Sequence, residues 1–239
     1  MPTILITGAA SGLGAAFLAH YAADPSNSLL ALDRSPIQPL PTCAARLTTH
    51  TLDITSEPSL ASLSRKLKDV PIDLLIHSAG VRGLVPELAQ SHPGDAARAE
   101  TIEVTDRETM RAAFEINTLG AFVLIRMLLP NLRLAAAPRA VVMSSRMGSV
   151  SYNSTGGGYA YRASKAALNA VVKSLSIDVP EVMFVLVHPG RVETGLVEWK
   201  EEGAIGADES VREMVALVGR LGREDSGRFV DRWGKDIGW

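Results

Sequence analysis

The stretch "TILITGAASGLG", residues 3–14, decides the fold class. Its first half is an apolar run that predicts a buried strand, and Gly8, Gly12 and Gly14 then lead into an alanine-rich helical segment. Glycine permits a tight turn and lets the backbone approach a pyrophosphate, which the free N–H groups and dipole of a helix N-terminus attract. Strand, glycine turn and helix in this order predict a dinucleotide-binding unit, and the alternative is a structural turn that binds no ligand.

Outward from this stretch, short runs rich in Val, Ile and Leu alternate with longer amphipathic segments. The runs read as strands buried on both faces, because no polar alternation interrupts them. They are "TILITG" (3–8), "SLLALD" (28–33), "THTLDI" (49–54), "DLLIHSAG" (73–80), "AVVMSS" (140–145) and "MFVLVHPG" (183–190). We predict an α/β chain whose residues 1–239 form a single-domain, Rossmann-type, doubly wound parallel sheet of about seven strands with helices on both faces.

Composition limits the classes of function. The 24 basic and 26 acidic residues leave a net charge of -2 without a basic block, which argues against a nucleic-acid groove. Cys43 is the one cysteine, so no intramolecular disulfide is expected. The most apolar later segment, residues 121–138, is interrupted by Arg126, Pro130 and Arg133 and predicts a buried helix, not a membrane span. We expect a cytoplasmic protein with no membrane partner.

Charged residues at the ends of the second and third predicted strands bear on the choice of cofactor. The carboxylate of Asp33 suits the adenosine ribose hydroxyls and would repel a 2′-phosphate, which favours NAD over NADP. The next residue, Arg34, either pairs with a 2′-phosphate or is a solvated loop charge. Asp53 either meets the adenine amino group or is a turn or cap side chain. We predict NAD, with NADP as the alternative.

The segment "GGGYAYRASKAAL", residues 156–168, places a phenol beside an ammonium. On a helix, residues four apart are offset by about 40° and residues six apart by roughly 240°, so Tyr161 shares a face with Lys165 and Tyr159 does not. A nearby ammonium would lower the phenol pKa from about 10 toward the range of efficient acid–base catalysis. The alternative is an ordinary i, i+4 surface pair.

Two serines, Ser144 and Ser145, end the predicted strand in "VVMSSRMGS". At this position a hydroxyl could donate a hydrogen bond to a substrate carbonyl oxygen. Successive strand residues point to opposite sides, so we expect only one of the two to do so.

Together these features resemble the short-chain dehydrogenases/reductases over essentially the whole chain. The motifs that carry the resemblance are Thr7-Gly8-x3-Gly12-x-Gly14, Asp53, "SAG" at 78–80, Asn117 in "FEINTLGAF", the serine pair, Tyr161-x3-Lys165 and "HPGRVET" at 188–194. "SSRMGS", "GGGYAYRASKAALN" and the tail "DSGRFVDRWGKDIGW" are most similar to the C-factor and sniffer-type carbonyl reductase branch. In that branch extra residues with glycines precede the tyrosine, which matches the long step from Ser145 to Tyr161.

The resemblance implies a role for each catalytic position. Tyr161 would exchange a proton with the substrate oxygen, and Lys165 would lower the tyrosine pKa and hold the nicotinamide ribose. Ser145, as the second serine of the pair, would orient the carbonyl and stabilise charge on its oxygen. Asn117 would keep a helix irregular enough to seat a water that links Lys165 to solvent. Thr194 would bond the nicotinamide carboxamide.

The cofactor contacts implied by the resemblance extend over the whole edge of the sheet. They are Thr7, Gly8, Ser11, Gly12, Leu13, Gly14, Asp33, Arg34, Asp53, Ile54, Ser78, Ala79, Gly80, Tyr161, Lys165, Pro189, Gly190, Val192 and Thr194. Ser11 stands where NADP-preferring members often carry a basic residue, in line with NAD. His77 replaces an amide of the family's "NNAG", and we interpret it as a packed histidine with one satisfied nitrogen in preference to an extra catalytic group. No metal site is predicted.

We expect an NAD(P)-dependent oxidoreductase that interconverts a carbonyl and a secondary alcohol on a small or medium apolar substrate. The alternatives are a cofactor-bound signalling or scaffold protein of the same fold and a non-redox cyclase or epimerase. Residues 82–104 and 193–210 should contact the substrate.

The segments 107–129 and 161–175 have wide apolar faces, which in this family pair across subunits, so we predict a homodimer or homotetramer. The alternative is burial of both faces against the sheet.

Overall fold

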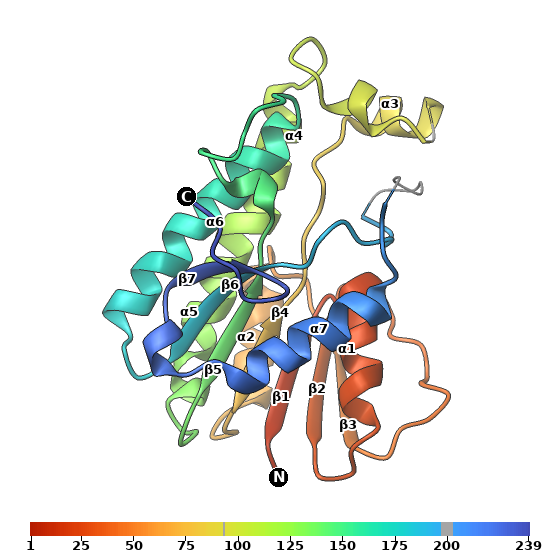
Figure 1. The fold of residues 1–239 in the computed structure, drawn as a ribbon. Helices are drawn as coiled ribbons and strands as arrows, with labels where there is room; N and C mark the ends of the chain where they lie inside the picture. Colours follow the sequence, from red (N-terminus) through yellow and green to blue (C-terminus); the bar gives the residue numbers. More distant parts are fainter. Residues whose placement is uncertain (93, 197–202) are drawn as a thin grey trace.

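The computed structural model describes residues 1–92, 94–196 and 203–239, and its centre is a parallel sheet (Figure 1). Its seven strands follow the order β3-β2-β1-β4-β5-β6-β7, and each described pair of neighbours is parallel. The strands are β1 (Thr3–Thr7), β2 (Ser28–Asp33), β3 (Arg46–Thr51), β4 (Leu74–His77), β5 (Arg139–Met143), β6 (Met183–His188) and β7 (Arg228–Asp231). The chain moves outward from β1 to β3 and then returns to β4, so the order reverses between β1 and β4. Crevices at such a switch point bind ligands.

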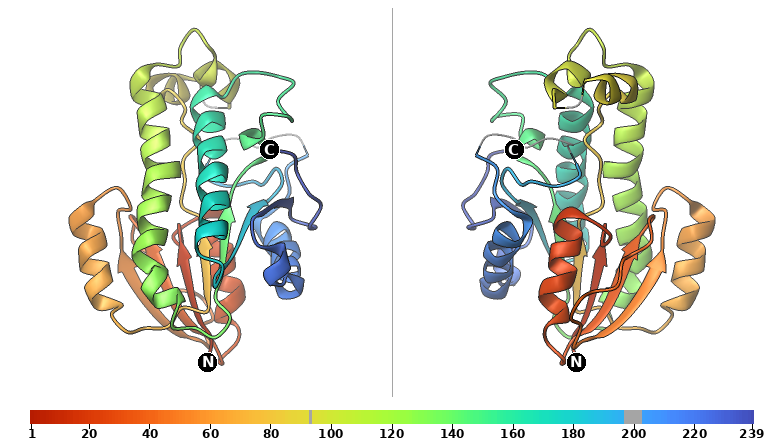
Figure 2. Two further views of the ribbon diagram at one scale, coloured as in Figure 1. Left: turned by 90° about the vertical axis from the view of Figure 1, so that its left-hand side faces the viewer. Right: turned by 90° about the vertical axis from the view of Figure 1, so that its right-hand side faces the viewer.

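Helices cover both faces of the sheet (Figure 2). One layer is formed by α1 and α7, and the other by α2, α5 and α6. The helices are α1 (Gly12–Ala22), α2 (Glu57–Lys66), α3 (Pro86–Ser91), α4 (Arg107–Phe114), α5 (Ala121–Leu132), α6 (Tyr159–Asp178) and α7 (Ala207–Arg220). Short helical segments are η1 (Ala96–Glu100), η2 (Glu115–Gly120), η3 (Arg146–Gly148) and η4 (Arg223–Asp225). This confirms the predicted α/β fold with helices on both faces.

The strands separate two apolar cores because successive side chains point to opposite faces. In β1, Leu5 belongs to the core under α2, α5 and α6, whereas Ile4 and Ile6 belong to the core under α1 and α7. In β6, Phe184 and Leu186 belong to the first of these cores, whereas Val185 and Val187 belong to the second. Continuous apolar runs are therefore what these two-sided strands require.

The third strand differs from its prediction. We expected residues 49–54 to be buried on both faces, but β3 covers Arg46–Thr51, with no residue fully buried. It is the edge strand and, in the described part of the chain, pairs only with β2, in a register that joins Ser28 to Arg46 and Asp33 to Thr51. Asp53 therefore lies beyond the strand, in the turn toward α2. The seventh strand, β7, lies in the C-terminal segment, where the sequence reading located none.

The segment Arg107–Leu132 runs continuously through α4, η2 and α5 and is long and apolar enough, by length and composition, to cross a membrane. In the structure its second half packs against the sheet, and Leu124, Ile125 and Leu128 are fully buried there. The segment therefore contains the core helix that was predicted. That helix ends at Leu132, and Pro130 lies inside it.

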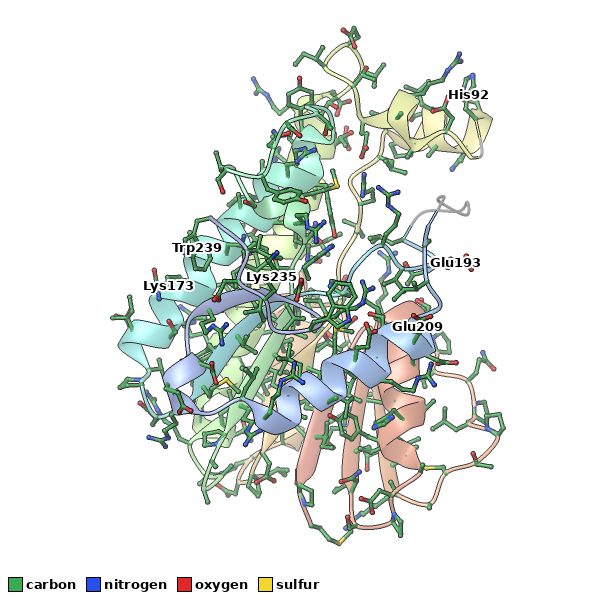
Figure 3. The ribbon with its side chains drawn as sticks, viewed as in Figure 1. His92, Lys173, Glu193, Glu209, Lys235 and Trp239 are labelled. Atoms are coloured by element: carbon green, nitrogen blue, oxygen red, sulfur yellow. The ribbon has the colours of Figure 1, made fainter. Side chains whose placement is uncertain are left out.

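Two loops rise from the carboxyl edge of the sheet. Residues 82–104 contain α3 and η1, and α3 ends beside His92, far from the Trp239 end of the chain (Figure 3). The second loop begins at Glu193 and returns to α7, whose first turn carries Glu209 (Figure 3). Residues 197–202 of this predicted substrate loop lie outside the described residues.

Candidate active site

A cleft of about 590 Å³ opens at the carboxyl ends of the first strands. Most of the predicted cofactor residues line it, namely Thr7, Gly8, Ser11, Gly12, Leu13, Asp33, Arg34, Asp53, Ile54, Ser78, Ala79, Gly80 and Thr194. The remaining ones, Gly14, Tyr161, Lys165, Pro189, Gly190 and Val192, lie outside this lining. The cleft coincides with the reversal of strand order, so it has the position of a nucleotide site.

The glycine turn presents bare backbone to the cleft. Gly8 and Gly12 have φ of 68° and 52°, a conformation that side chains disfavour. A Cβ on Gly8 would lie 3.0 Å from the nitrogen of Ala79, and one on Gly12 would lie 3.1 Å from the Cβ of Thr194. A Cβ on Gly14 would overlap the Gly8 carbonyl, so Gly14 lets α1 pack on the turn. These residues fit a pyrophosphate held at the start of α1.

The hydroxyl of Thr7 links β1 to the loop after β4. Its Oγ1 accepts hydrogen bonds from the backbone nitrogens of Ser78 (3.1 Å) and Ala79 (3.2 Å). Because both lone pairs are used, the Thr7 hydrogen points to Nδ1 of His77, 3.0 Å away, and the ring proton belongs on Nε2. That Nε2 is buried and has no hydrogen-bond partner within the described part of the chain.

Burial, and then the charge of Lys165, lower the pKa of His77 to about 3. The imidazole is therefore neutral and packed, with one satisfied nitrogen, as the sequence suggested. Burial likewise lowers the pKa of His188 to about 4. Neither ring is in a protonation state that would make it an acid at neutral pH.

Asp33 and Asp53 both reach the cleft, in different ways. The carboxylate of Asp33 accepts hydrogen bonds from the backbone of Ala10 (2.9 Å) and of Ser35 (2.8 Å), which fix it in the lining of the cleft. Asp53 accepts from the backbone and hydroxyl of Thr55, at 2.9 and 2.7 Å. Asp53 is thus a turn side chain, the alternative left open by its spacing, although it also lines the cleft.

A π-helical segment, η2, interrupts the long helix at Asn117. The Asn117 Oδ1 accepts from the nitrogen of Val81 at 2.8 Å, and its Nδ2 donates to the Val81 carbonyl at 2.8 Å. The same Nδ2 donates to Oγ of Ser164 at 2.9 Å. Asn117 therefore ties the loop after β4 to α6 from an irregular helix, the kind of helix that the resemblance implied, and π turns are frequent at functional sites.

The two serines after β5 face different partners. Ser144 Oγ donates to Oδ1 of Asn169 at 2.6 Å inside the core. Ser145 Oγ accepts from the nitrogen of Met147 at 3.1 Å, and its hydrogen bond with Tyr161 lowers the pKa of the phenol. Ser145 is therefore the serine beside the tyrosine.

Tyr161 and Lys165 are both buried on one face of α6, with exposed fractions of 7% and 4%, while Tyr159 is 39% exposed. The Lys165 Nζ lies 5.8 Å from the centre of the Tyr161 ring and donates to the carbonyl of Met143 at 3.0 Å. Burial lowers the pKa of Lys165 to about 8. The two groups share a face, as the spacing predicts.

The expected effect on acidity is wrong for this structure. Burial raises the pKa of Tyr161, and the charge of Arg82 opposes this, followed by the hydrogen bond with Ser145. The reason is desolvation: a phenolate loses more by leaving water than the neutral phenol does.

Among the described residues of the loop after β6, Thr194, Gly195 and Leu196 line the cleft, and Thr194 is the one with a predicted cofactor contact. Thr194 lies beside Gly12, whereas the Pro189 carbonyl accepts from Oγ of Ser210 at 2.7 Å and Gly190 has a φ of 93°. Val192 pairs with Ile205 in an isolated bridge. Cofactor contacts by Pro189, Gly190 and Val192 stay predictions.

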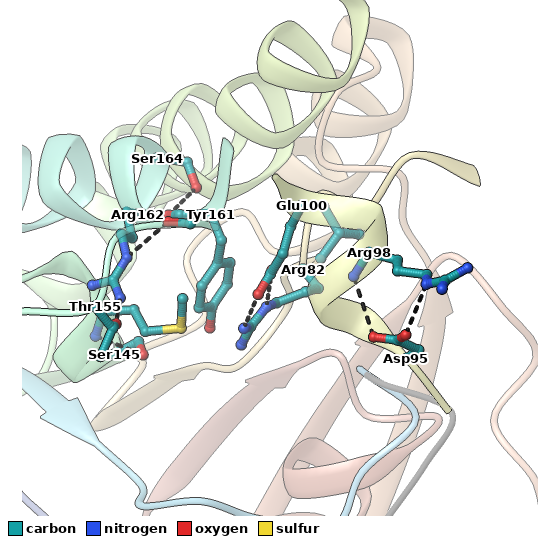
Figure 4. Close-up of polar contacts among 12 residues, drawn as sticks. Arg82, Asp95, Arg98, Glu100, Ser145, Thr155, Tyr161, Arg162 and Ser164 are labelled. Carbon is teal, nitrogen blue, oxygen red and sulfur yellow. Dashed lines mark hydrogen bonds and ion pairs between the residues drawn. The ribbon is translucent and has the colours of Figure 1, made fainter. Parts of the chain in front are cut away.

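An ion pair beside the tyrosine was not found from the sequence. Arg82 donates from Nε and Nη2 to the two carboxylate oxygens of Glu100, at 2.9 Å each, and its guanidinium carbon lies 5.0 Å from the centre of the Tyr161 ring (Figure 4). No local signal marks this pair, because the residues come from a loop without a motif.

The family model described as short chain dehydrogenase matches residues 2–204. This chain belongs to the short-chain dehydrogenase family. It is 40% identical over 171 residues to the "C-signal" of Myxococcus xanthus, which covers 71% of this chain and 93% of that protein. The NADPH-bound carbonyl reductase from chicken fatty liver superposes with a TM-score of 0.82 at 28% identity, covering 100% of this chain and 99% of the other. The carbonyl reductase Sniffer of D. melanogaster gives a TM-score of 0.81 at 27% identity and covers 100% of both chains.

These comparisons confirm the predicted family and its C-factor and carbonyl reductase branch. The short-chain dehydrogenase is therefore an oxidoreductase that uses NAD or NADP, and its glycine turn and cleft are where such a cofactor fits.

Proposed function

We propose that this dehydrogenase interconverts a carbonyl group and a secondary alcohol on a small or medium apolar substrate, with Tyr161 as the proton-transfer group. The observation that carries the proposal is the meeting of the four expected catalytic residues beside the nucleotide cleft. Gly80 lines the cleft, and a Cβ there would lie 3.0 Å from Oδ1 of Asn117 and 3.5 Å from Nζ of Lys165. Asn117 and Lys165 therefore lie directly behind a residue of the cleft, and the cleft residue Arg82 lies against the Tyr161 ring.

Each residue does what its surroundings allow. Burial keeps the Tyr161 phenol protonated at neutral pH, so its hydroxyl can give a proton to a substrate oxygen during reduction. In the oxidation direction the phenolate takes the proton of the alcohol and becomes the phenol again. The Ser145 hydroxyl donates to the same oxygen and stabilises negative charge on it. A nicotinamide dinucleotide in the cleft supplies or accepts the hydride. The ribose would be held by Lys165, and the carboxamide by Thr194.

The irregular helix at Asn117 supports proton supply from solvent. Its side chain makes three hydrogen bonds, two to Val81 and one to Ser164, so its position is fixed next to Lys165. In the proposed reaction, η2 seats the water through which Lys165 exchanges protons with solvent.

For the cofactor we propose NAD in preference to NADP. The Asp33 carboxylate is fixed by two backbone amides and faces the cleft, where it would repel a 2′-phosphate. Titration with NADH and with NADPH, followed by Trp quenching and nicotinamide emission, should show tighter binding of NADH. Tighter binding of NADPH would mean that Arg34 pairs with the phosphate.

The reaction is tested by Tyr161→Phe, with Tyr159→Phe as the matched control on the same helix. We expect Tyr161→Phe to remove most turnover of a carbonyl substrate and leave the Kd for NADH unchanged, because the phenyl ring keeps its packing. Tyr159 is 39% exposed and lies on another face, so its variant should retain activity. Full activity of Tyr161→Phe would contradict the assignment.

A second candidate is a cofactor-loaded signalling protein, favoured by the 40% identity to a protein named C-signal. If signalling is the function, Tyr161→Phe should retain all cellular activity.

A third candidate is the non-redox cyclase or epimerase. It would form product without net oxidation of the nicotinamide, which absorbance at the NADH band would reveal.

We also propose a cytoplasmic homodimer or homotetramer that pairs through α4 and α6. A groove of about 320 Å³ lies between these helices and includes Met110, Phe114 and Leu119; the last two are each 40% exposed. Light scattering should give at least twice the mass of one chain. A strict monomer at micromolar concentration would refute this part, and cell fractionation tests the location.

A further inference from the structure

Arg82 lies where the nucleotide cleft meets the active-site tyrosine. It lines the cleft, and its guanidinium carbon is 5.0 Å from the centre of the Tyr161 ring. Figure 4 shows the ring between Ser145 on one side and Arg82 on the other. The four expected catalytic residues do not include this arginine.

The backbone that carries Arg82 is fixed. On one side of it, the nitrogen and the carbonyl of Val81 are both bonded to the Asn117 amide at 2.8 Å. On the other side, Gly83 has a φ of 71°, and a Cβ there would lie 2.9 and 3.0 Å from methyl groups on α4 and α6. The side chain therefore starts from a position that Asn117 and two helices define.

The tip of the side chain is fixed by Glu100. Its carboxylate accepts hydrogen bonds from Nε and Nη2 of Arg82, each at 2.9 Å. The side chain of Arg82 is only 15% exposed and that of Glu100 only 13%. The Glu100 carbonyl accepts from the nitrogen of Gly158 at 2.9 Å, in the triple-glycine turn that leads into α6. Gly156, Gly157 and Gly158 have φ of 66°, 63° and 59°, so the turn is left-handed and brings its backbone against Glu100.

Several charges act on the phenol from different elements. Arg82 lowers the pKa of Tyr161 and Glu100 raises it, with the effect of Arg82 larger because its charge lies against the ring. Lys165 lies 5.8 Å from the ring centre on α6 and donates to a strand carbonyl. Arg162 turns away and donates to the carbonyl of Gly157 at 3.0 Å.

We propose that Arg82 is a positioning residue that makes the Tyr161 hydroxyl a stronger acid, with Glu100 holding its guanidinium against the ring. A positive charge favours the phenolate, and more strongly where water is excluded. The inference rests on the proposed role of Tyr161 and adds a residue from the substrate loop to it. The loop thereby supplies a charge that tunes proton transfer as well as contacts to the substrate.

The test is a titration of residue 161 itself. A difluorotyrosine, whose phenol titrates closer to neutral pH, is placed at position 161, and its ionisation is followed by fluorine NMR in the cofactor-free protein. Arg82→Met and Arg82→Gln should each raise the titration midpoint by about one pH unit or more. Arg82→Lys keeps the charge and should restore most of the shift.

The control is Arg162→Met, which removes an arginine that holds the same glycine turn but does not contact the ring. If Arg82 acts only by holding the loops together, Arg162→Met should raise the midpoint equally, and that result would overturn the proposal. An unchanged titration midpoint in a folded Arg82→Met or Arg82→Gln variant would also overturn the proposal. Because no substrate is present, failure of the proposed reaction leaves this titration readable. In the active enzyme, the limb of the kcat–pH profile should move in the same direction.

Discussion

Replacing His77 with Asn should remove a large part of the acid sensitivity of folding. The imidazole is 1% exposed, its Nδ1 accepts from Thr7, and its Nε2 has no partner among the described residues. A second proton would have to enter this site next to Lys165, whose charge adds to the cost of burial. Asn keeps an acceptor near the Thr7 hydroxyl and does not titrate.

The magnitude follows from linkage. The folded pKa of His77 is about 3, whereas an unfolded histidine has a pKa of about 6.5. Below pH 6.5 the unfolded chain therefore binds a proton that the folded protein does not, and stability falls as the pH decreases toward 3. Between pH 7.5 and 5 this one group should lower the free energy of unfolding by about 2 kcal/mol.

Urea denaturation at several pH values between 7.5 and 5 measures the effect. Between pH 7.5 and 5 the free energy of unfolding should fall by about 2 kcal/mol less in His77→Asn than in the parent, whatever the variant's stability at pH 7.5. His20→Asn, at an exposed position on α1, is the matched control for replacing a histidine. An identical slope in His77→Asn and the parent would refute the assignment of a neutral, buried imidazole.

Ser144→Ala should lower the free energy of unfolding by about 1–3 kcal/mol and spare kcat, because it leaves the buried amide oxygen of Asn169 without its donor. Ser145→Ala should instead spare the free energy of unfolding and lower kcat about 10²-fold. Denaturation measures the first quantity and steady-state kinetics the second. Gly14→Ala should abolish NADH binding or folding, because its methyl overlaps the glycine turn. Gly219→Ala, where the methyl meets open space on α7, should stabilise the protein by about 0.5–1 kcal/mol in thermal unfolding; destabilisation by both glycine variants to a similar extent would contradict the packing argument.

The strands and the glycine turn could be predicted because their causes are local. A strand covered on both faces must be apolar throughout, and a helix start that approaches a phosphate must lack side chains. The same rule failed for β3, because an edge strand needs no apolar run. The strand was predicted to extend beyond Thr51 because residues 52 and 54 are apolar. Both are buried, but they belong to the core under α2, α5 and α6 and lie after the end of the strand.

The site shows where local reasoning ends. Helical spacing places Tyr161 and Lys165 on one face, and the structure has them there, but spacing contains no information about the water that surrounds the phenol. Burial raises the pKa of Tyr161, and the cation that opposes burial comes from Arg82, far away in sequence. Its position depends on Asn117, on the backbone turn at Gly83 and on Glu100 together. A local motif therefore predicts some of the groups that meet at the tyrosine, whereas the cation that opposes burial depends on tertiary packing of the loop after β4. If Arg82 has the role proposed above, relatives with the same Tyr-x3-Lys motif and a different loop should differ in the pH dependence of their chemistry.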